Sequence, residues 1–135
     1  MRELLPRRLV LGATLAGLAA FPVPSLASSA DVMVVYVFAD DCAPCHLFQT
    51  QDWPLFRASR VSRVVNFVRT TAPKTTQAYQ ARFWPSEARP FLSAVKVPIV
   101  PSFILVKKGS VLVIGNGIVG WRNQVLPQVH QLAEG

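Results

Sequence analysis

The chain has 135 residues, of which 51% are hydrophobic and 16% are charged, and its formal net charge is +7. This composition fits a single globular domain with an ordinary hydrophobic core and excludes an intrinsically disordered chain. The basic residues beyond residue 30 are scattered along the sequence and form no run or aromatic-interleaved patch. We therefore expect a solvated basic surface and no nucleic-acid partner.

The first 30 residues have the pattern of a secretory signal peptide. Three arginines precede an apolar run over residues 9–21, and small residues then offer cleavage sites after Ala27 or Ala30. The apolar run is shorter than the roughly 20 residues that span a bilayer. We expect residues 1–30 to be a signal peptide and residues 31–135 to form the domain, with no stable membrane span.

The pair Arg7 and Arg8, followed by Leu-Val-Leu, resembles a twin-arginine export signal, although Pro6 stands where that pattern usually has Ser or Thr. The sequence leaves open which export route is used and whether the segment is cleaved. By either route we predict an exported, periplasmic protein.

The segment that follows alternates strand and helix patterns. Residues 33–39 are apolar and largely β-branched, which is typical of a buried strand. Pro44 suits the first turn of a helix that begins after this strand. The further elements expected are the rest of that helix to about Asp52, a short helix over 55–59, a strand over 64–69, helices over 75–83 and 87–95, strands over 102–106 and 111–114, a loop over 115–120 and a helix over 123–132. This order predicts an α/β domain with helices packed on a mixed four-stranded sheet.

Cys42 and Cys45 are the only two cysteines of the chain. A bridge between residues three apart closes too small a loop to constrain the unfolded chain much, so a structural disulfide explains the spacing poorly. At a helix start, free N–H groups and the helix dipole stabilise a thiolate at Cys42. Cys45 lies about one turn further on, within reach of a disulfide. The pair therefore has the arrangement of a redox centre in which Cys42 attacks and Cys45 resolves.

Two segments resemble the thioredoxin superfamily. Val35-Tyr36-Val37-Phe38-Ala39-Asp40-Asp41-Cys42-Ala43-Pro44-Cys45 is similar to the family's strand and active-site turn, and Val100-Pro101-Ser102-Phe103-Ile104-Leu105-Val106-Lys107-Lys108-Gly109 is similar to its cis-proline segment. The resemblance covers about residues 32–132. It implies a thioredoxin-like fold that is N-terminally short and carries a helical insertion before the cis-proline strand.

The resemblance also implies roles for particular residues. Pro101 would be a cis-proline that faces the cysteines, and the main chain of Val100 would pair with an extended substrate segment. No cofactor is expected beyond the redox-active disulfide of Cys42 and Cys45. Either Gly117 or Gly120 would lie beside the active site.

Three residues depart from the family's pattern and are candidates for tuning the cysteine pair. Asp41 replaces the aromatic residue that often precedes the first cysteine, and with Asp40 it is expected to raise the pKa of Cys42. Tyr36 stands where many thioredoxins have a buried acid. His46, directly after Cys45, is a candidate substitute for that acid in proton transfer, with a plain surface histidine as the alternative.

Two other functions fit the same cysteines. Cys42-Ala43-Pro44-Cys45-His46 matches the C-x-x-C-H pattern of c-type haem attachment, with His130 as the downstream candidate for an axial ligand. The same side chains, with Asp40 or Asp41, offer a marginal ligand set for a copper or zinc carrier.

The segment Gly115-Asn116-Gly117-Ile118-Val119-Gly120 matches G-x-G-x-x-G. Only 15 residues follow it, too few for the βαβ unit of a dinucleotide-binding fold, so we expect a loop before the last helix.

The combined pattern predicts a periplasmic thiol–disulfide oxidoreductase, with a haem c or copper/zinc carrier as the alternative. The Ala-Pro dipeptide between the cysteines resembles exported reductases more than oxidases or isomerases. We therefore expect the protein to reduce disulfides of exported partner proteins, to be resupplied by an upstream electron donor and to act as a monomer. Neither the substrate nor the donor is defined by the sequence.

Overall fold

The computed structural model describes residues 31–134. The predicted signal peptide, with Arg7, Arg8 and the two cleavage sites, lies outside the described residues. Within the described part of the chain, no helix is long and apolar enough to cross a membrane.

Four strands form one mixed sheet in the order β2-β1-β3-β4. The strands are β1 (Val32–Ala39), β2 (Asn66–Ala72), β3 (Ser102–Lys107) and β4 (Ser110–Asn116). β1 pairs in parallel with β2 and antiparallel with β3, and β3 pairs antiparallel with β4. The apolar run that predicted a buried strand is thus the central strand β1, with neighbours on both edges. The predicted strand over 64–69 is shifted, because Arg60–Val64 forms a 3-10 turn before β2 begins.

One long helix follows β1 and runs from Ala43 to Ala58 in three parts. These are α2 (Ala43–Leu47), a π-helical stretch (Phe48–Asp52) and α3 (Trp53–Ala58). The prediction of two separate helices was wrong, since the chain stays helical through the expected break at Pro54. A proline lacks the N–H that a helix interior needs, and the widened π turn just before Pro54 accommodates that missing donor without ending the helix.

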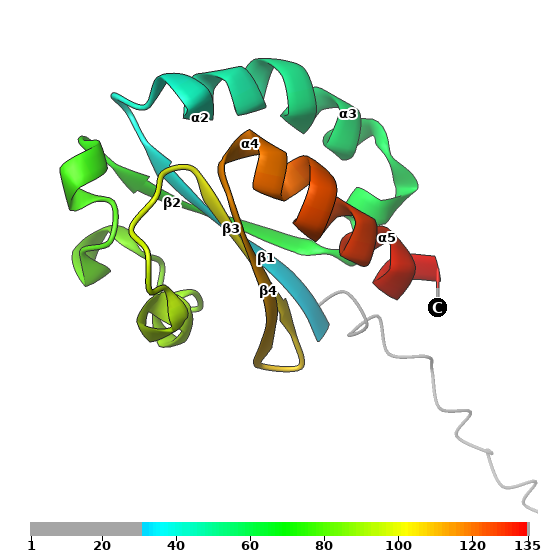
Figure 1. Cartoon of the computed structure of the whole chain (residues 1–135). Coiled ribbons are helices and arrows are strands. Elements are labelled where there is room, and N and C mark those ends of the chain that lie inside the picture. Colours follow the sequence, from blue (N-terminus) through cyan, green and yellow to red (C-terminus); the bar gives the residue numbers. More distant parts are fainter. Residues whose placement is uncertain (1–30, 135) are drawn as a thin grey trace, which may run out of the picture.

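The C-terminal helix has the same composite build. It consists of α4 (Gly117–Gly120), a π-helical stretch (Trp121–Val125) and α5 (Leu126–Glu134). The loop predicted over residues 115–120 is therefore wrong, since Gly115 ends up in β4 and the helix begins at Gly117. In Figure 1, α2 and α3 arch over α4 and α5, and both helices lie on the same side of the sheet.

The two helices are joined by a paired charge. The Arg122 Nε and Nη2 groups each donate a 2.8 Å hydrogen bond to one carboxylate oxygen of Asp52. Asp52 is buried at 8% exposure, whereas Arg122 is half exposed. The two hydrogen bonds from the guanidinium satisfy the buried carboxylate. In turn, Asp52 raises the pKa of Arg122, first through the hydrogen bond and second through its charge.

Two glycines allow β4 and α4 to meet closely. A Cβ atom on Gly115 would lie 2.6 Å from the carbonyl oxygen of Gly120, and one on Gly120 would lie 2.6 Å from the carbonyl carbon of Gly115. Either side chain would force the two backbones apart. Close packing of strand against helix therefore explains these two glycines of the G-x-G-x-x-G pattern.

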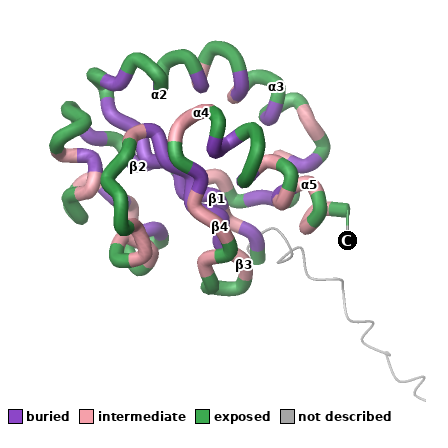
Figure 2. The backbone as a smooth tube through the Cα atoms, viewed as in Figure 1, coloured by how far each residue is buried: buried purple, intermediate pink, exposed green. Residues whose placement is uncertain are grey.

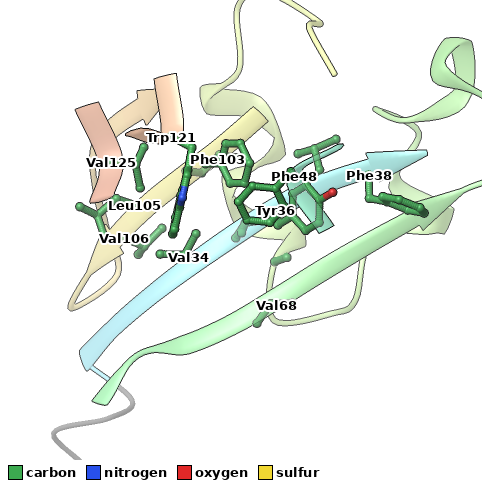
Figure 3. Close-up of a cluster of buried hydrophobic side chains, with 14 of the residues drawn as sticks. Val34, Tyr36, Phe38, Phe48, Val68, Phe103, Leu105, Val106, Trp121 and Val125 are labelled. Carbon is green, nitrogen blue, oxygen red and sulfur yellow. The ribbon is translucent and has the colours of Figure 1, made fainter. Parts of the chain in front are cut away.

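The core between helices and sheet is largely aromatic, and Figure 3 shows its centre. Tyr36 of β1 stacks on Phe103 of β3 at 5.1 Å and lies 4.8 Å from Phe48 of the first helix, measured between ring centroids. Trp121 of the second helix meets Phe48 edge-on at 5.3 Å. Offset and edge-to-face rings add to the free energy gained by burying their area. The aromatic cluster thus fixes both helices on one face of the sheet.

The segment between β2 and β3 contains short 3-10 turns instead of the two predicted α-helices. The turns are Thr75–Gln77, Ala81–Phe83 and Arg89–Ala94. Pro90 lies inside the helix predicted over residues 87–95 and removes a backbone donor that a continuous helix requires, whereas Pro73 and Pro85 flank the helix predicted over residues 75–83. Trp84 of the segment is buried, and its indole N–H donates to the Ala78 carbonyl at 2.8 Å. Figure 2 shows the sheet as the most continuously buried part of the chain, with this segment mostly exposed.

Candidate active site

The two cysteines lie where β1 ends and the first helix begins, and they form a disulfide. Cys42 is the N-cap of α2, and its Sγ accepts a 3.2 Å hydrogen bond from the Cys45 backbone N–H. The turn itself is held by two backbone bonds, from Asp40 N–H to the Ala72 carbonyl at 2.8 Å and from Cys42 N–H to the Ala39 carbonyl at 3.2 Å. The end of the buried strand β1 therefore places the sulfur atoms at a helix N-terminus, where a thiolate is stabilised.

The two cysteines differ slightly in their exposure to solvent. Cys45 is fully buried, whereas Cys42 keeps 3% of its surface exposed. Ala43 and Pro44, between the cysteines, are exposed. A partner that approaches the disulfide from solvent therefore meets Cys42 first.

The Val100–Pro101 segment lies at the same end of the sheet. The peptide bond between these residues is cis, and Pro101 is buried while Val100 is partly exposed. The Pro101 carbonyl accepts a 2.7 Å hydrogen bond from the N–H of Gly117, which has a φ of +71°. This hydrogen bond makes Gly117 the glycine that adjoins the proline segment, and its positive φ is a backbone conformation that favours glycine.

Tyr36 is buried in the aromatic cluster and reaches the cysteines through its hydroxyl. The Tyr36 O–H donates to the Cys45 carbonyl at 3.1 Å. Burial raises the pKa of this phenol well above its ordinary value of 10.0, and the nearby Arg69 guanidinium lowers it by less. Tyr36 therefore stays neutral at physiological pH and acts here as a hydrogen-bond donor to the backbone of the first helical turn.

The His46 ring contacts residues that precede Cys42 in the chain. Its Nε2 donates to the Asp40 carbonyl at 2.7 Å, and its ring meets Phe38 edge-on at 5.6 Å between centroids. The side chain is exposed. In this arrangement His46 links the first helical turn to the residue that follows β1, so it helps to hold the turn that carries the cysteines.

Asp41 also has a partner of its own. Its carboxylate oxygen Oδ1 accepts a 2.7 Å hydrogen bond from the Thr75 backbone N–H, at the start of the first 3-10 turn after β2. This bond ties the residue before Cys42 to a segment more than 30 positions later. The expected rise in the pKa of the Cys42 thiol from Asp41 stays a prediction.

The structure thus gathers Cys42, Cys45, Val100 and Pro101 at one end of the sheet. At this site the two sulfur atoms are bonded to each other, and His46 Nε2 donates to a backbone carbonyl. Among residues 31–134 no group of three or more His, Cys, Asp or Glu side chains is placed to hold a metal ion.

Two residues at the site were not predicted from the sequence. Thr75 contributes through its backbone N–H, for which residue type gives no signal. Tyr79 donates from its hydroxyl to the Ile99 carbonyl, which ties the same segment to the loop before Pro101. Neither contact can be inferred from spacing, since each joins segments about 20 or more residues apart.

Comparison with known proteins supports the fold. No family model matches the chain, and no curated protein matches it by sequence. Among solved structures, a thioredoxin from Malassezia sympodialis is 14% identical with a TM-score of 0.52, over 76% of this chain and 78% of that one. The long form of thioredoxin f from spinach chloroplast is 18% identical with a TM-score of 0.52, over 81% of this chain and 75% of that one.

These similarities confirm the predicted thioredoxin-like α/β fold, with its mixed four-stranded sheet flanked by helices. Within this fold, the disulfide at the start of the first helix has the arrangement that thiol–disulfide exchange requires.

Replacing Tyr36 by Phe tests the part played by the phenol. At pH 7 we expect Tyr36→Phe to lower the free energy of unfolding by about 1 kcal/mol, because it removes the hydroxyl bond to Cys45. Above about pH 10 unfolded tyrosines lose their protons while buried Tyr36 keeps its own, so the wild type loses up to about 1.4 kcal/mol per pH unit from this group. The difference between the two proteins should therefore shrink from pH 10 upward, as measured by urea unfolding.

The chain contains only two tyrosines, and burial raises the pKa of Tyr79 as well. Tyr79→Phe alone serves as the matched comparison, and the double variant removes all phenol titration. A Tyr36→Phe protein with the same stability loss at pH 7 and pH 11 would contradict the account.

Proposed function

We propose that the protein is a thiol–disulfide oxidoreductase whose reduced Cys42 and Cys45 thiols reduce disulfides of exported proteins and are left as the Cys42–Cys45 disulfide. The observation that carries this proposal is the placement of the disulfide at a helix N-terminus, at the same end of the sheet as the cis Val100–Pro101 bond. The helix N-terminus stabilises a thiolate at Cys42, and the main chain of the partly exposed Val100 would pair with an extended peptide.

The exchange proceeds in two substitutions at sulfur. In the reduced protein the Cys42 thiolate attacks one sulfur of a substrate disulfide, which forms a mixed disulfide and releases the other substrate sulfur as a thiolate. Cys45 then loses its proton and attacks Cys42 Sγ, which releases the second substrate thiolate. The substrate gains two electrons and two protons, and the protein ends with the Cys42–Cys45 disulfide.

The burial of the two cysteines supports this division of roles. Cys42 has the exposed surface that a nucleophile needs, whereas the buried Cys45 is reached only from its neighbour. The next cycle requires a dithiol donor that reduces the disulfide again. We propose reduction as the working direction, because the Ala-Pro dipeptide resembles that of exported reductases.

The proposed location is the periplasm. Its support is the signal-peptide pattern of residues 1–30. The partners in that compartment would be exported proteins with disulfides and an upstream dithiol donor, and we propose that the protein meets them as a monomer.

Serine variants of the two cysteines test the mechanism. Cys42→Ser should abolish the acceleration of insulin reduction over the rate with dithiothreitol alone, because the attacking thiol is removed. Cys45→Ser should also lose this acceleration, and without dithiothreitol it should accumulate a covalent adduct with insulin chains, since the mixed disulfide cannot be resolved. Turbidity measures turnover, and mass spectrometry of the non-reduced protein measures the adduct.

The Cys45→Ser protein treated with fully reduced insulin is the control and should form no adduct. An adduct that forms equally well in Cys42→Ser would contradict the assignment of the nucleophile. A wild-type protein that reduces no disulfide would contradict the function itself.

Export is tested separately by expression of the full chain in a bacterium with both export routes. We expect the protein in the periplasmic fraction with an N-terminus at Ser28 or Asp31, as read by mass spectrometry. The variant Arg7→Lys/Arg8→Lys should stop export if the twin-arginine route is used and leave it unchanged on the general route. Protein that stays in the cytoplasm with residues 1–30 attached would contradict the location.

A further inference from the structure

Strand β2 lies at one edge of the sheet, and in the described part of the chain its only neighbouring strand is β1. The Ala72 carbonyl accepts a 2.8 Å hydrogen bond from the Asp40 N–H at the end of β1, so the backbone of Ala72 faces β1. Backbone groups alternate in direction along a strand, so the N–H and C=O groups of Phe67, Arg69 and Thr71 face away from β1. These three residues therefore offer a row of backbone donors and acceptors to an added strand.

A small apolar pocket lies beside this edge, on the face of the sheet that carries the helices. Its volume is about 180 Å³, and its lining residues are Tyr36, Gln49, Trp53, Phe67 and Arg69. Phe67 and Arg69 belong to β2, whereas Gln49 and Trp53 belong to the first helix. An engineered cavity of about 150 Å³ in another protein binds benzene, so this pocket has room for one apolar side chain.

The charge along this edge is positive. The turn before β2, the strand itself and the residues after it contain Arg60, Arg63, Arg69 and Lys74, with no acidic residue between them in the sequence. All four side chains are exposed. The Arg69 guanidinium lies 4.9 Å from the centre of the Phe38 ring, and no carboxylate of residues 31–134 forms a salt bridge with it.

One acidic side chain reaches this edge from another segment. The Glu87 carboxylate accepts a 3.3 Å hydrogen bond from the side-chain amide of Asn66, the first residue of β2. Asn66 precedes Phe67, and successive side chains of a strand point to opposite faces, so Glu87 lies on the face opposite the pocket. The pocket side of the edge therefore keeps its positive charge.

We propose that the β2 edge and this pocket bind an extended acidic segment of a partner protein, which adds to the sheet as a strand beside β2. The backbone of the segment would bond to Phe67, Arg69 and Thr71, while one apolar side chain enters the pocket and a carboxylate pairs with Arg69. The pocket contains no cysteine and no residue of the cis-proline segment. The inference is therefore independent of the proposed redox function.

A second copy of this chain is a poorer occupant than an acidic segment. Antiparallel pairing of two β2 edges about Arg69 would place the two Arg69 side chains opposite each other, and like charges at opposite positions of a sheet destabilise the pairing. The exposed Arg63 and Lys74 of both copies would lie in the same interface. An acidic segment would instead offset the charge of these residues.

Hydrogen exchange of backbone amides, followed by NMR, tests the edge directly. In the free protein the amides of Phe67, Arg69 and Thr71 should exchange fast, whereas those of Val68 and Thr70, which face β1, should exchange slowly. The probe is the capped peptide Thr-Glu-Val-Leu-Val-Glu-Thr, whose Leu and Glu side chains share one face of a strand. At saturation it should slow exchange of the first three amides about tenfold or more.

Altered peptides test each part of the recognition. Replacing both Glu by Lys, or Leu by Ser, should weaken binding about tenfold, because the first change opposes Arg69 and the second leaves the pocket unfilled. Two N-methylated forms, one at the Val residues and one at the Leu and Glu residues, each remove the donors on one side of the peptide. One form should lose binding and the other should keep it, since only one side of an added strand faces β2.

Reversal of one charge on the protein supplies the matched comparison. Arg69→Glu should bind the Lys peptide more tightly than the Glu peptide, which reverses the wild-type order. The control is Lys96→Glu, the same change at an exposed residue beside β4, on the opposite edge of the sheet. Lys96→Glu should keep the wild-type order, and slow exchange at Val68 and Thr70 should show that both variants are folded.

Three results would overturn the proposal. The first is no protection of the Phe67, Arg69 and Thr71 amides by the peptide, and the second is equal effects of Arg69→Glu and Lys96→Glu. The third is protection of these amides that rises with protein concentration in the absence of peptide, which would assign the edge to a second copy. None of these results bears on disulfide exchange at Cys42, which is measured separately.

Discussion

The burial of β1 between two hydrogen-bonded neighbours is the constraint on which the site depends. Val34, Val35 and Val37 have no exposed surface, and Tyr36 has 1%. Because β1 pairs with β2 on one side and β3 on the other, its carboxyl end lies beside the end of β2 and the start of β3. Segments that are far apart in sequence therefore meet at Cys42.

The aromatic cluster packs against β1 and further restricts its movement. Tyr36 contributes a ring to that cluster and a hydroxyl to the Cys45 carbonyl, so one residue connects the core to the reactive turn. Tyr36 was expected to leave this position without the carboxylate of many thioredoxins, and in the structure it supplies a neutral phenol that donates a hydrogen bond. This part of the site is therefore held by aromatic packing and by a hydrogen bond to the backbone.

The polar residues around the disulfide have structural partners too. The Asp41 carboxylate accepts a hydrogen bond from the Thr75 N–H, and His46 donates one to the Asp40 carbonyl. The Asp41 bond joins the reactive turn to the segment after β2, and the His46 bond ties the first helical turn to the residue after β1. Substitutions at either residue therefore act on the shape of the site as well as on its charge.

Much of the fold was predictable because its signals are local. A continuous apolar run indicated β1, and Pro44, between the two cysteines, indicated where α2 begins. The failures have physical causes. The π-helical turn before Pro54 accommodated the break that a proline normally imposes, and Pro90 lies inside the helix predicted over residues 87–95, where it removes a backbone donor.

In the candidate site, too, features with local sequence signals were predictable and tertiary contacts were not. Cys42 and Cys45 were identified from their spacing, and Pro101 from a resemblance. The partners of Asp41, His46 and Tyr36 were not predictable, since a side chain's contacts depend on tertiary packing that no short pattern encodes. A groove is lined by Thr75, Thr76, Tyr79, Pro98 and Val100. It lies between two segments that are brought together only when the sheet has assembled.

The most direct measurement for the central claim is the redox equilibrium of the Cys42–Cys45 pair in the intact protein. The protein is equilibrated in buffers with graded ratios of reduced to oxidised dithiothreitol, and free thiols are alkylated and counted by mass. The account predicts one reversible transition of two electrons, approached equally from the oxidised and reduced sides, with about 30 mV for each tenfold change in the ratio. A native disulfide that stays oxidised in excess dithiol, or thiols that do not reoxidise, would contradict it.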